Sequence, residues 1–299
     1  MTLTPTGLAF TLPLLAAALS AGAEEWPDIR SVPLDLTVPP LAEGTPAAGK
    51  RVRAVAAEYA GTAVYHTLYL PLDWEPGRRY PVIVEYAGNG PYQNAYGDTC
   101  TGKVEDCGLG YGSSGGKGFI WVCLPTISAD RQHHQLQWWG DVEATVAYCL
   151  TVVPEVCRQY GGDPQAVLLA GFSRGAIACN YIGLHDDAIA ALWCGFICHS
   201  HYDGVLAWPY PGSDRAAAAR RLQRLGGRPQ FISHEVSSRA TREYLAAACP
   251  QGRFTFVDLR YRNHTDSWVR RDTAERQRLR EWVRNTLPGH SGQGGPDPE

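Results

Sequence analysis

The sequence AVLLAGFSRGAIA, residues 166–178, decides the fold of this 299-residue chain. Its first five residues are an apolar run typical of a buried strand, and the residues after Ser173 are typical of a helix. A sharp turn must connect the two, and the small residues Gly171 and Gly175 leave room for it. Such a turn exposes the hydroxyl of Ser173 at the positive end of the helix, where a developing negative charge is stabilised. The stretch therefore predicts that Ser173 is a nucleophile.

Apolar runs and helical patterns alternate on both sides of this turn. Residues 51–59 and 62–70 predict two strands joined at Gly61, a hairpin-like start. The other predicted strands cover residues 80–87, 118–124, 166–170, 190–198, 230–234 and 254–261, and further helices are predicted at 141–160, 213–225, 238–248 and 272–287. Strands that alternate with helices form a mostly parallel sheet with helices on both faces. The sequence therefore predicts an α/β fold in one domain without a large cap.

The two ends of the chain differ in composition from the domain between them. An apolar stretch over residues 8–19, followed by Ala21-Gly22-Ala23, is typical of a secretory signal peptide cleaved after Ala23. The stretch is shorter than the roughly 20 apolar residues that span a membrane. We therefore expect a secreted or periplasmic protein with no membrane span in the mature chain. The predicted division is a signal peptide at 1–23, an irregular arm at 24–50, the α/β domain at 51–287 and a disordered tail at 288–299.

The composition argues against several classes of protein. A formal net charge of −3 and a pI near 6.3 provide no basic surface for nucleic acid. No CxxC motif pairs with a second one or with a spaced pair of histidines, so we expect neither a metal nor another cofactor. Nine cysteines suit an oxidising compartment, and Cys100 and Cys107 are close enough in a Gly-rich loop to form a short disulfide.

A second motif lies near the C-terminal end of the domain. His264 stands in the sequence RNHTDSW, residues 262–268, between the last predicted strand and the last predicted helix. Together with the GxSxG turn, this histidine resembles the α/β-hydrolases of the secreted esterase type, including feruloyl, acetylxylan and polyester esterases. The resemblance covers residues 60–287 in the order of elements. It implies that Ser173 attacks an acyl carbon, that His264 takes its proton, and that an acid orients His264.

The orienting acid is where the chain departs from the family pattern. In the family it usually follows the penultimate strand, but here that segment reads FISHEVSS, residues 231–238, with a serine near the expected position. Glu235 closes this strand directly. Asp203, in the sequence HSHYDG, follows the preceding strand, a placement that some lipases use. Both carboxylates are candidates, whereas Asp266 is too close to His264 in the sequence.

The resemblance also implies an oxyanion hole. The backbone N–H of Arg174 would supply one donor, and the loop after strand 80–87 would supply the other. This loop begins with Gly88 and Asn89, in place of the HGGG of many esterases; the alternative is a simple turn bounded by Pro91. Glucuronoyl esterases carry an arginine after the serine, in a GxSRxG pattern. The side chain of Arg174 therefore indicates a substrate carboxylate, support of the oxyanion, or a surface salt bridge.

Aromatic residues near the expected site are candidates for substrate binding. Trp138 and Trp139 come after the carboxyl end of strand 118–124, at the edge where open α/β sheets bind ligands. They would either stack on sugar or aromatic rings or anchor the next helix in the core. Tyr92 lies in the Gly-rich loop and would line the cleft.

Taken together, these features predict a secreted serine hydrolase that cleaves carboxylic esters through an acyl-enzyme. Carbohydrate- or polymer-linked esters suit a chain with no evident lid. Two alternatives remain open: a serine peptidase of the same fold, and a non-catalytic relative that binds a ligand or partner.

Overall fold

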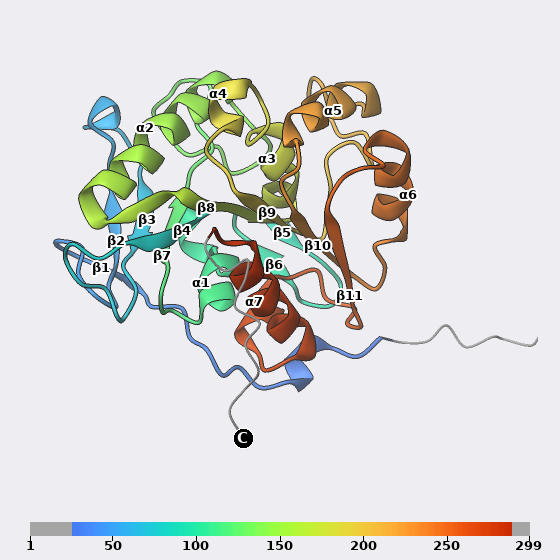
Figure 1. The fold of residues 1–299 in the computed structure, drawn as a ribbon, viewed down its shortest axis with the longest axis horizontal. Coiled ribbons are helices and arrows are strands. Elements are labelled where there is room, and N and C mark those ends of the chain that lie inside the picture. Colours follow the sequence, from blue (N-terminus) through green and yellow to red (C-terminus); the bar gives the residue numbers. More distant parts are fainter. Residues whose placement is uncertain (1–25, 289–299) are drawn as a thin grey trace, which may run out of the picture.

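A nine-stranded sheet forms the centre of the computed structural model, which describes residues 26–288 (Figure 1). The predicted signal peptide and residues 289–299 of the predicted tail lie outside the described residues. The strands follow the order β1-β2-β3-β7-β4-β8-β9-β10-β11. Their bounds are β1 Leu41–Ala42, β2 Arg51–Ala54, β3 His66–Tyr69, β4 Tyr80–Tyr86, β7 Ile120–Leu124, β8 Gly162–Phe172, β9 Gly195–His199, β10 Gln230–Glu235 and β11 Phe254–Leu259.

Pairing in the sheet is mostly parallel. All neighbours from β7 through β4, β8, β9 and β10 to β11 run in the same direction. Strand β3 pairs antiparallel with both β2 and β7, which confirms the predicted antiparallel opening. The connection between β2 and β3 is longer than a tight turn at Gly61, because a short 3₁₀ helix, Ala57–Tyr59, lies within it.

Helices cover both faces of the sheet, as the alternation predicts (Figure 1). Helices α1 and α7 pack on one face, and α2 to α6 pack on the other. Strand β4 shows why two cores form: Val82 and Val84 join one core, and Ile83 between them joins the other. The helices are α1 Leu109–Ser114, α2 Val142–Tyr160, α3 Arg174–Tyr181, α4 Asp187–Ala190, α5 Arg215–Leu222, α6 Arg239–Ala248 and α7 Ala274–Thr286.

Residues 88–117, which lie between two predicted strands, contain structure that the sequence pattern did not predict. Strands β5 Tyr92–Gln93 and β6 Thr99–Cys100 form a small antiparallel pair, and helix α1 follows them. The buried carboxylate of Glu85 explains the helix. It accepts hydrogen bonds from the first backbone N–H groups around α1, at Gly108, Leu109 and Gly110. A cap that comes from a distant strand leaves no local sequence signal.

The nine cysteines all lie within the described residues, and all are free. The suggested disulfide between Cys100 and Cys107 is therefore absent. Cys107 is buried beside Cys123 and Glu85, whereas Cys100 is half-buried near the backbone of Gly88. The thiols of Cys100 and Cys107 therefore have different neighbours.

The N-terminal arm is ordered along residues 26–50. It contains a short 3₁₀ helix, Ile29–Ser31, and strand β1, which extends the sheet beside β2. Asp35 of the arm forms an ion pair with Arg276 of α7, at 2.5 and 2.7 Å. Within residues 26–288, no helix has both the length and the apolar character needed to span a membrane.

Candidate active site

Ser173 occupies a strained turn between β8 and α3. Its φ is +56° and its ψ is −117°, a conformation that residues other than glycine rarely adopt. The turn packs tightly against the neighbouring strand, because a Cβ atom added to Gly175 would lie 1.9 Å from the carbonyl oxygen of Tyr86. A Cβ atom on Gly171 would lie 2.1 Å from the backbone of Gly175. Only glycine fits at these two positions, and the turn that they allow places Ser173 at the wall of a pocket.

His264 lies directly beside this hydroxyl. Its Nε2 is 3.1 Å from Ser173 Oγ, and its Nδ1 is 2.6 Å from Glu235 Oε1. Burial by itself would raise the pKa of Glu235. The hydrogen bond with His264 and the attraction of the carboxylate to the imidazolium form of that ring outweigh this effect and lower that pKa to about 2. The three side chains form one hydrogen-bonded chain from carboxylate to imidazole to hydroxyl.

Asp203, the other candidate acid, lies elsewhere. Its side chain is 1% exposed, and its two oxygens accept hydrogen bonds from Arg221 at 2.9 and 3.0 Å. Burial raises its pKa to about 6 despite the opposing effect of Arg221. Of the two candidates, the structure therefore brings Glu235, and not Asp203, against His264.

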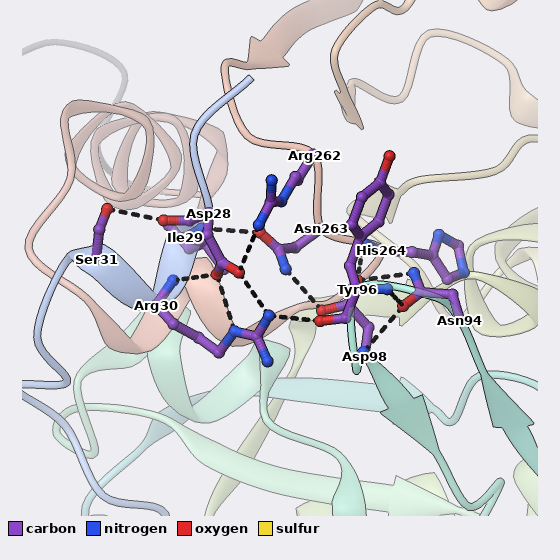
Figure 2. A network of polar contacts seen from close by, with 10 residues as sticks. All are labelled: Asp28, Ile29, Arg30, Ser31, Asn94, Tyr96, Asp98, Arg262, Asn263 and His264. Carbon is purple, nitrogen blue, oxygen red and sulfur yellow. Dashed lines mark hydrogen bonds and ion pairs between the residues drawn. The ribbon is translucent and has the colours of Figure 1, made fainter. Parts of the chain in front are cut away.

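The loop that carries His264 is held by a polar network (Figure 2). Asp98 accepts hydrogen bonds from the backbone N–H of His264 at 2.9 Å and from the side-chain amide of Asn263 at 2.8 Å. The amide oxygen of Asn263 accepts a hydrogen bond from the backbone N–H of Ile29 in the arm, at 2.8 Å. Three segments distant in sequence thus converge behind the histidine.

A pocket with a volume of about 160 Å³ opens in front of Ser173. Among residues 26–288, the backbone N–H groups of Asn89 and Arg174 have no hydrogen-bond acceptor, and both residues line this pocket. Gly88 instead lines a neighbouring cavity. The lining residues of the Ser173 pocket are Asn89, Tyr92, Cys100, Trp138, Ser173, Arg174, Ile177, His201, Trp208 and His264.

The guanidinium of Arg174 is buried behind the pocket wall, with 3% of the residue exposed. It donates hydrogen bonds to the carbonyl oxygens of Trp138 at 2.6 Å and Gln135 at 3.0 Å. Burial lowers its pKa to about 10. In the described part of the chain it forms no ion pair, so the surface salt bridge considered above is not present. Arg174 instead ties the loop before α2 to the turn after Ser173.

The adjacent tryptophans have different positions. Trp138 lines the pocket with a φ of +54°, and its ring lies 5.2 Å from that of Trp208. Its backbone N–H donates to the Asn89 side chain at 2.8 Å, which holds the strained residue in place. Trp139 is buried and stacks on Tyr181 with ring centroids 4.7 Å apart, so it anchors the core. Tyr92 lines the pocket, with its ring 5.1 Å from that of His264.

One group of residues has the composition of a metal site. The ligand atoms of Glu85, Cys107 and Cys123 lie within 4.8 Å of one another. Burial raises the pKa of Glu85 to about 7. Both carboxylate oxygens already accept N–H donors, including the indole of Trp121. The group therefore fits a helix cap better than a metal centre.

Similarity to known proteins appears only at the level of structure. No protein-family model matches the sequence, and no curated protein matches it. One similar structure is a thermostable esterase, with a TM-score of 0.50 and 15% identity over 78% of this chain and 61% of that chain. Another is Thermogutta terrifontis esterase 2 phosphorylated by paraoxon, with a TM-score of 0.52 and 17% identity over 74% of this chain and 87% of that chain.

A third similar structure is the acylaminoacyl peptidase of Pyrococcus horikoshii, with a TM-score of 0.54 and 14% identity. The match covers 83% of this chain but 42% of the peptidase, so the chain spans less than two thirds of both this peptidase and the thermostable esterase. These enzymes share the mostly parallel sheet with helices on both faces. The protein has the α/β-hydrolase fold.

The α/β-hydrolase fold brings the site residues together because parallel strands end at one edge of the sheet. Residues after β4, β8, β9 and β11 and the last residue of β10 meet there. The segment after β9 contributes Ser200 and His201, and Trp208 follows; sequence reasoning missed all three. Their signal was the HSHYDG sequence directly after a predicted strand, in which only the aspartate was considered.

Proposed function

We propose that this protein is a serine hydrolase that cleaves carboxylic esters through an acyl-enzyme. The observation that carries the proposal is the chain of hydrogen bonds from Glu235 through His264 to Ser173 at a strained strand-to-helix turn. In this assignment Ser173 is the nucleophile, His264 is the general base, and Glu235 is the orienting acid.

The distances support a definite sequence of steps. Ser173 Oγ attacks the acyl carbon while its proton passes to His264 Nε2, 3.1 Å away. Glu235 stabilises the imidazolium that forms. The acyl–oxygen bond then breaks, and the leaving alcohol takes the proton from His264. Water, activated by the same histidine, hydrolyses the acyl-enzyme and releases Ser173.

The oxyanion that forms in each step needs hydrogen-bond donors. We assign this role to the backbone N–H groups of Arg174 and Asn89, which line the pocket without an acceptor among the described residues. Each such donor contributes about 3 kcal/mol to the stability of the transition state. Gly88 is the weaker candidate because it faces the neighbouring cavity.

The pocket limits the group that binds beside Ser173. A volume of about 160 Å³ matches a group about as large as a benzene ring. Trp138 and Trp208 line it with their rings, and Tyr92 lies at the histidine. We propose that this pocket takes one end of an ester linked to a carbohydrate or polymer. Export by the signal peptide at residues 1–23 would bring the protein to such substrates outside the cytoplasm.

A fluorophosphonate probe tests the proposal directly. Such probes react preferentially with an activated serine, and one structurally similar esterase has been phosphorylated by paraoxon. We expect mass spectrometry to locate the label on Ser173 in the folded protein. Ser173→Ala should abolish both labelling and ester turnover while leaving the unfolding temperature nearly unchanged. Absence of label in the folded wild-type protein would contradict the proposal and favour a non-catalytic binding protein.

A serine peptidase is the second candidate. The acylaminoacyl peptidase has the highest TM-score of the three similar structures described above, 0.54. The two functions separate on matched substrates with the same acyl group. We expect the protein to hydrolyse the ester and not the corresponding amide; faster turnover of the amide would favour the peptidase.

A further inference from the structure

Ser200 stands directly behind the proposed catalytic residues. It follows the last residue of β9, and its φ of +83° lies in the left-handed region that favours glycine. It is buried, and its backbone N–H donates to the carbonyl oxygen of Ser233 at 2.7 Å. A non-glycine residue held in such a conformation stores strain, which proteins retain mainly at functional sites.

The hydroxyl of Ser200 contacts both the acid and the base. Its Oγ lies 2.9 Å from Glu235 Oε1 and 2.8 Å from His264 Nδ1, and a longer contact of 3.3 Å joins it to His201 Nδ1. The single hydroxyl proton is donated to the carboxylate. The oxygen then accepts part of the hydrogen bond from the Nδ1–H of His264, which faces Glu235 at 2.6 Å as well. The three polar groups form a closed triangle.

The triangle matters because Glu235 has few other partners. Its second oxygen, Oε2, is buried and has no hydrogen-bond partner among the described residues. The carboxylate is therefore held through Oε1 alone, by His264 and Ser200. Without the hydroxyl of Ser200, the single hydrogen bond between Glu235 and His264 would have to hold the carboxylate in place. The same bond would also have to select the tautomer of the imidazole and fix its orientation.

We propose that Ser200 is a positioning residue for the proposed reaction: its hydroxyl holds Glu235 and His264 in the geometry that directs Nε2 at Ser173. This inference rests on the proposed function. Ser200 does not line the Ser173 pocket, and its contact with the pocket residue His201 is the longest of its three, so it acts through His264 and not through substrate contact. Its removal should therefore lower kcat and leave KM unchanged.

Two substitutions separate the hydroxyl from the backbone strain. Ser200→Ala and Ser200→Gly both remove the hydroxyl, but only glycine adopts a φ of +83° without strain. We expect both to lower kcat by about 10- to 100-fold, as for a hydrogen bond to a charged group. Ser200→Gly should unfold at a higher temperature than Ser200→Ala. Equal kcat values in these two variants of unequal stability would assign the effect to the hydroxyl.

The control is Ser113→Ala, which removes another buried hydroxyl, bonded to the Leu109 carbonyl in α1. Its kcat should stay within twofold of the wild-type value. The experiment measures ester turnover and the rate of fluorophosphonate labelling of all four proteins. A wild-type protein that does not label would refute the proposed function itself. The role of Ser200 would be overturned if the wild-type protein is labelled but the Ser200 variants have the same kcat as the wild type. It would also be overturned if they differ from the wild type only in KM.

Discussion

Glu235 and Asp203 stand at or just after the carboxyl ends of neighbouring strands, yet their surroundings differ. Glu235 bonds to the imidazole of His264, whereas both oxygens of Asp203 bind the guanidinium of Arg221. Burial affects both carboxylates, and their partners decide the outcome: the pKa is about 2 for Glu235 and about 6 for Asp203. The surroundings of each carboxylate are therefore set by the side chain that it contacts, the imidazole of His264 for Glu235 and the guanidinium of Arg221 for Asp203.

This difference predicts opposite effects of two conservative substitutions. Glu235→Gln should lower kcat by about 10⁴, because an amide no longer stabilises the imidazolium or selects its tautomer. Asp203→Asn should leave kcat within a few-fold but destabilise the protein by about 3 kcal/mol, because it leaves the largely buried Arg221 without its counterion. Ester turnover and urea unfolding measure the two effects. The reverse pattern would make Asp203 the orienting acid.

At the scale of elements, the site depends on how closely α3 and β8 approach β4. The turn at Ser173 presses Gly175 against the carbonyl of Tyr86, where no side chain fits. The same strand supplies Glu85, whose carboxylate caps α1 on the opposite face. Strand β4 therefore supports the turn at Ser173 with its backbone and caps helix α1 with the side chain of Glu85.

Gly175→Ala tests this contact. The added methyl group would lie 1.9 Å from a backbone oxygen, so α3 or β4 must shift. We expect a loss of about 3 kcal/mol in the free energy of unfolding, together with loss of turnover. The matched control is Gly227→Ala, since a Cβ atom there meets nothing within 4 Å. If both variants unfolded and reacted like the wild-type protein, the turn would not be packed as described.

At the scale of the whole molecule, distant segments fix the histidine. The arm, the loop between β5 and β6, and the loop after β11 meet through Ile29, Asp98 and Asn263 (Figure 2). Hydrogen bonds of this kind join residues more than 160 positions apart. The position of His264 is therefore a property of the folded chain and not of its own loop.

The hydrogen bond between Glu235, at the end of β10, and His264, in the loop after β11, also predicts how the stability of the whole protein depends on pH. The pKa of Glu235 in the folded protein is about 2, below its ordinary value of 4.5. Its contribution to stability is present above about pH 4.5 and is lost as the pH falls towards 2. This loss amounts to about 3 kcal/mol. We would measure the free energy of unfolding of the wild-type protein and of Glu235→Gln across this pH range. The difference between the two proteins should shrink as the pH falls. A constant difference would contradict the lowered pKa.

Much of the fold could be read from local patterns. Apolar runs and helical periodicity predicted each of the longer strands and helices, because strand and helix formation depend on the spacing of apolar side chains. The GxSxG turn also identified the strained position of Ser173, since tight turns require small residues in the sequence itself. Helix α1 escaped prediction because its cap comes from β4.

The sequence by itself determined the α/β class, the place of the strained turn at Ser173 and the candidate histidine, because these depend on spacing along one short segment at a time. Only the tertiary structure brought Glu235, and not Asp203, to His264, placed Trp138 in the pocket and Trp139 in the core, and brought Ser200 to the imidazole. These outcomes depend on which strand ends lie side by side in the sheet. That order, β8-β9-β10-β11 at the site, arises from packing and backbone hydrogen bonds between distant segments.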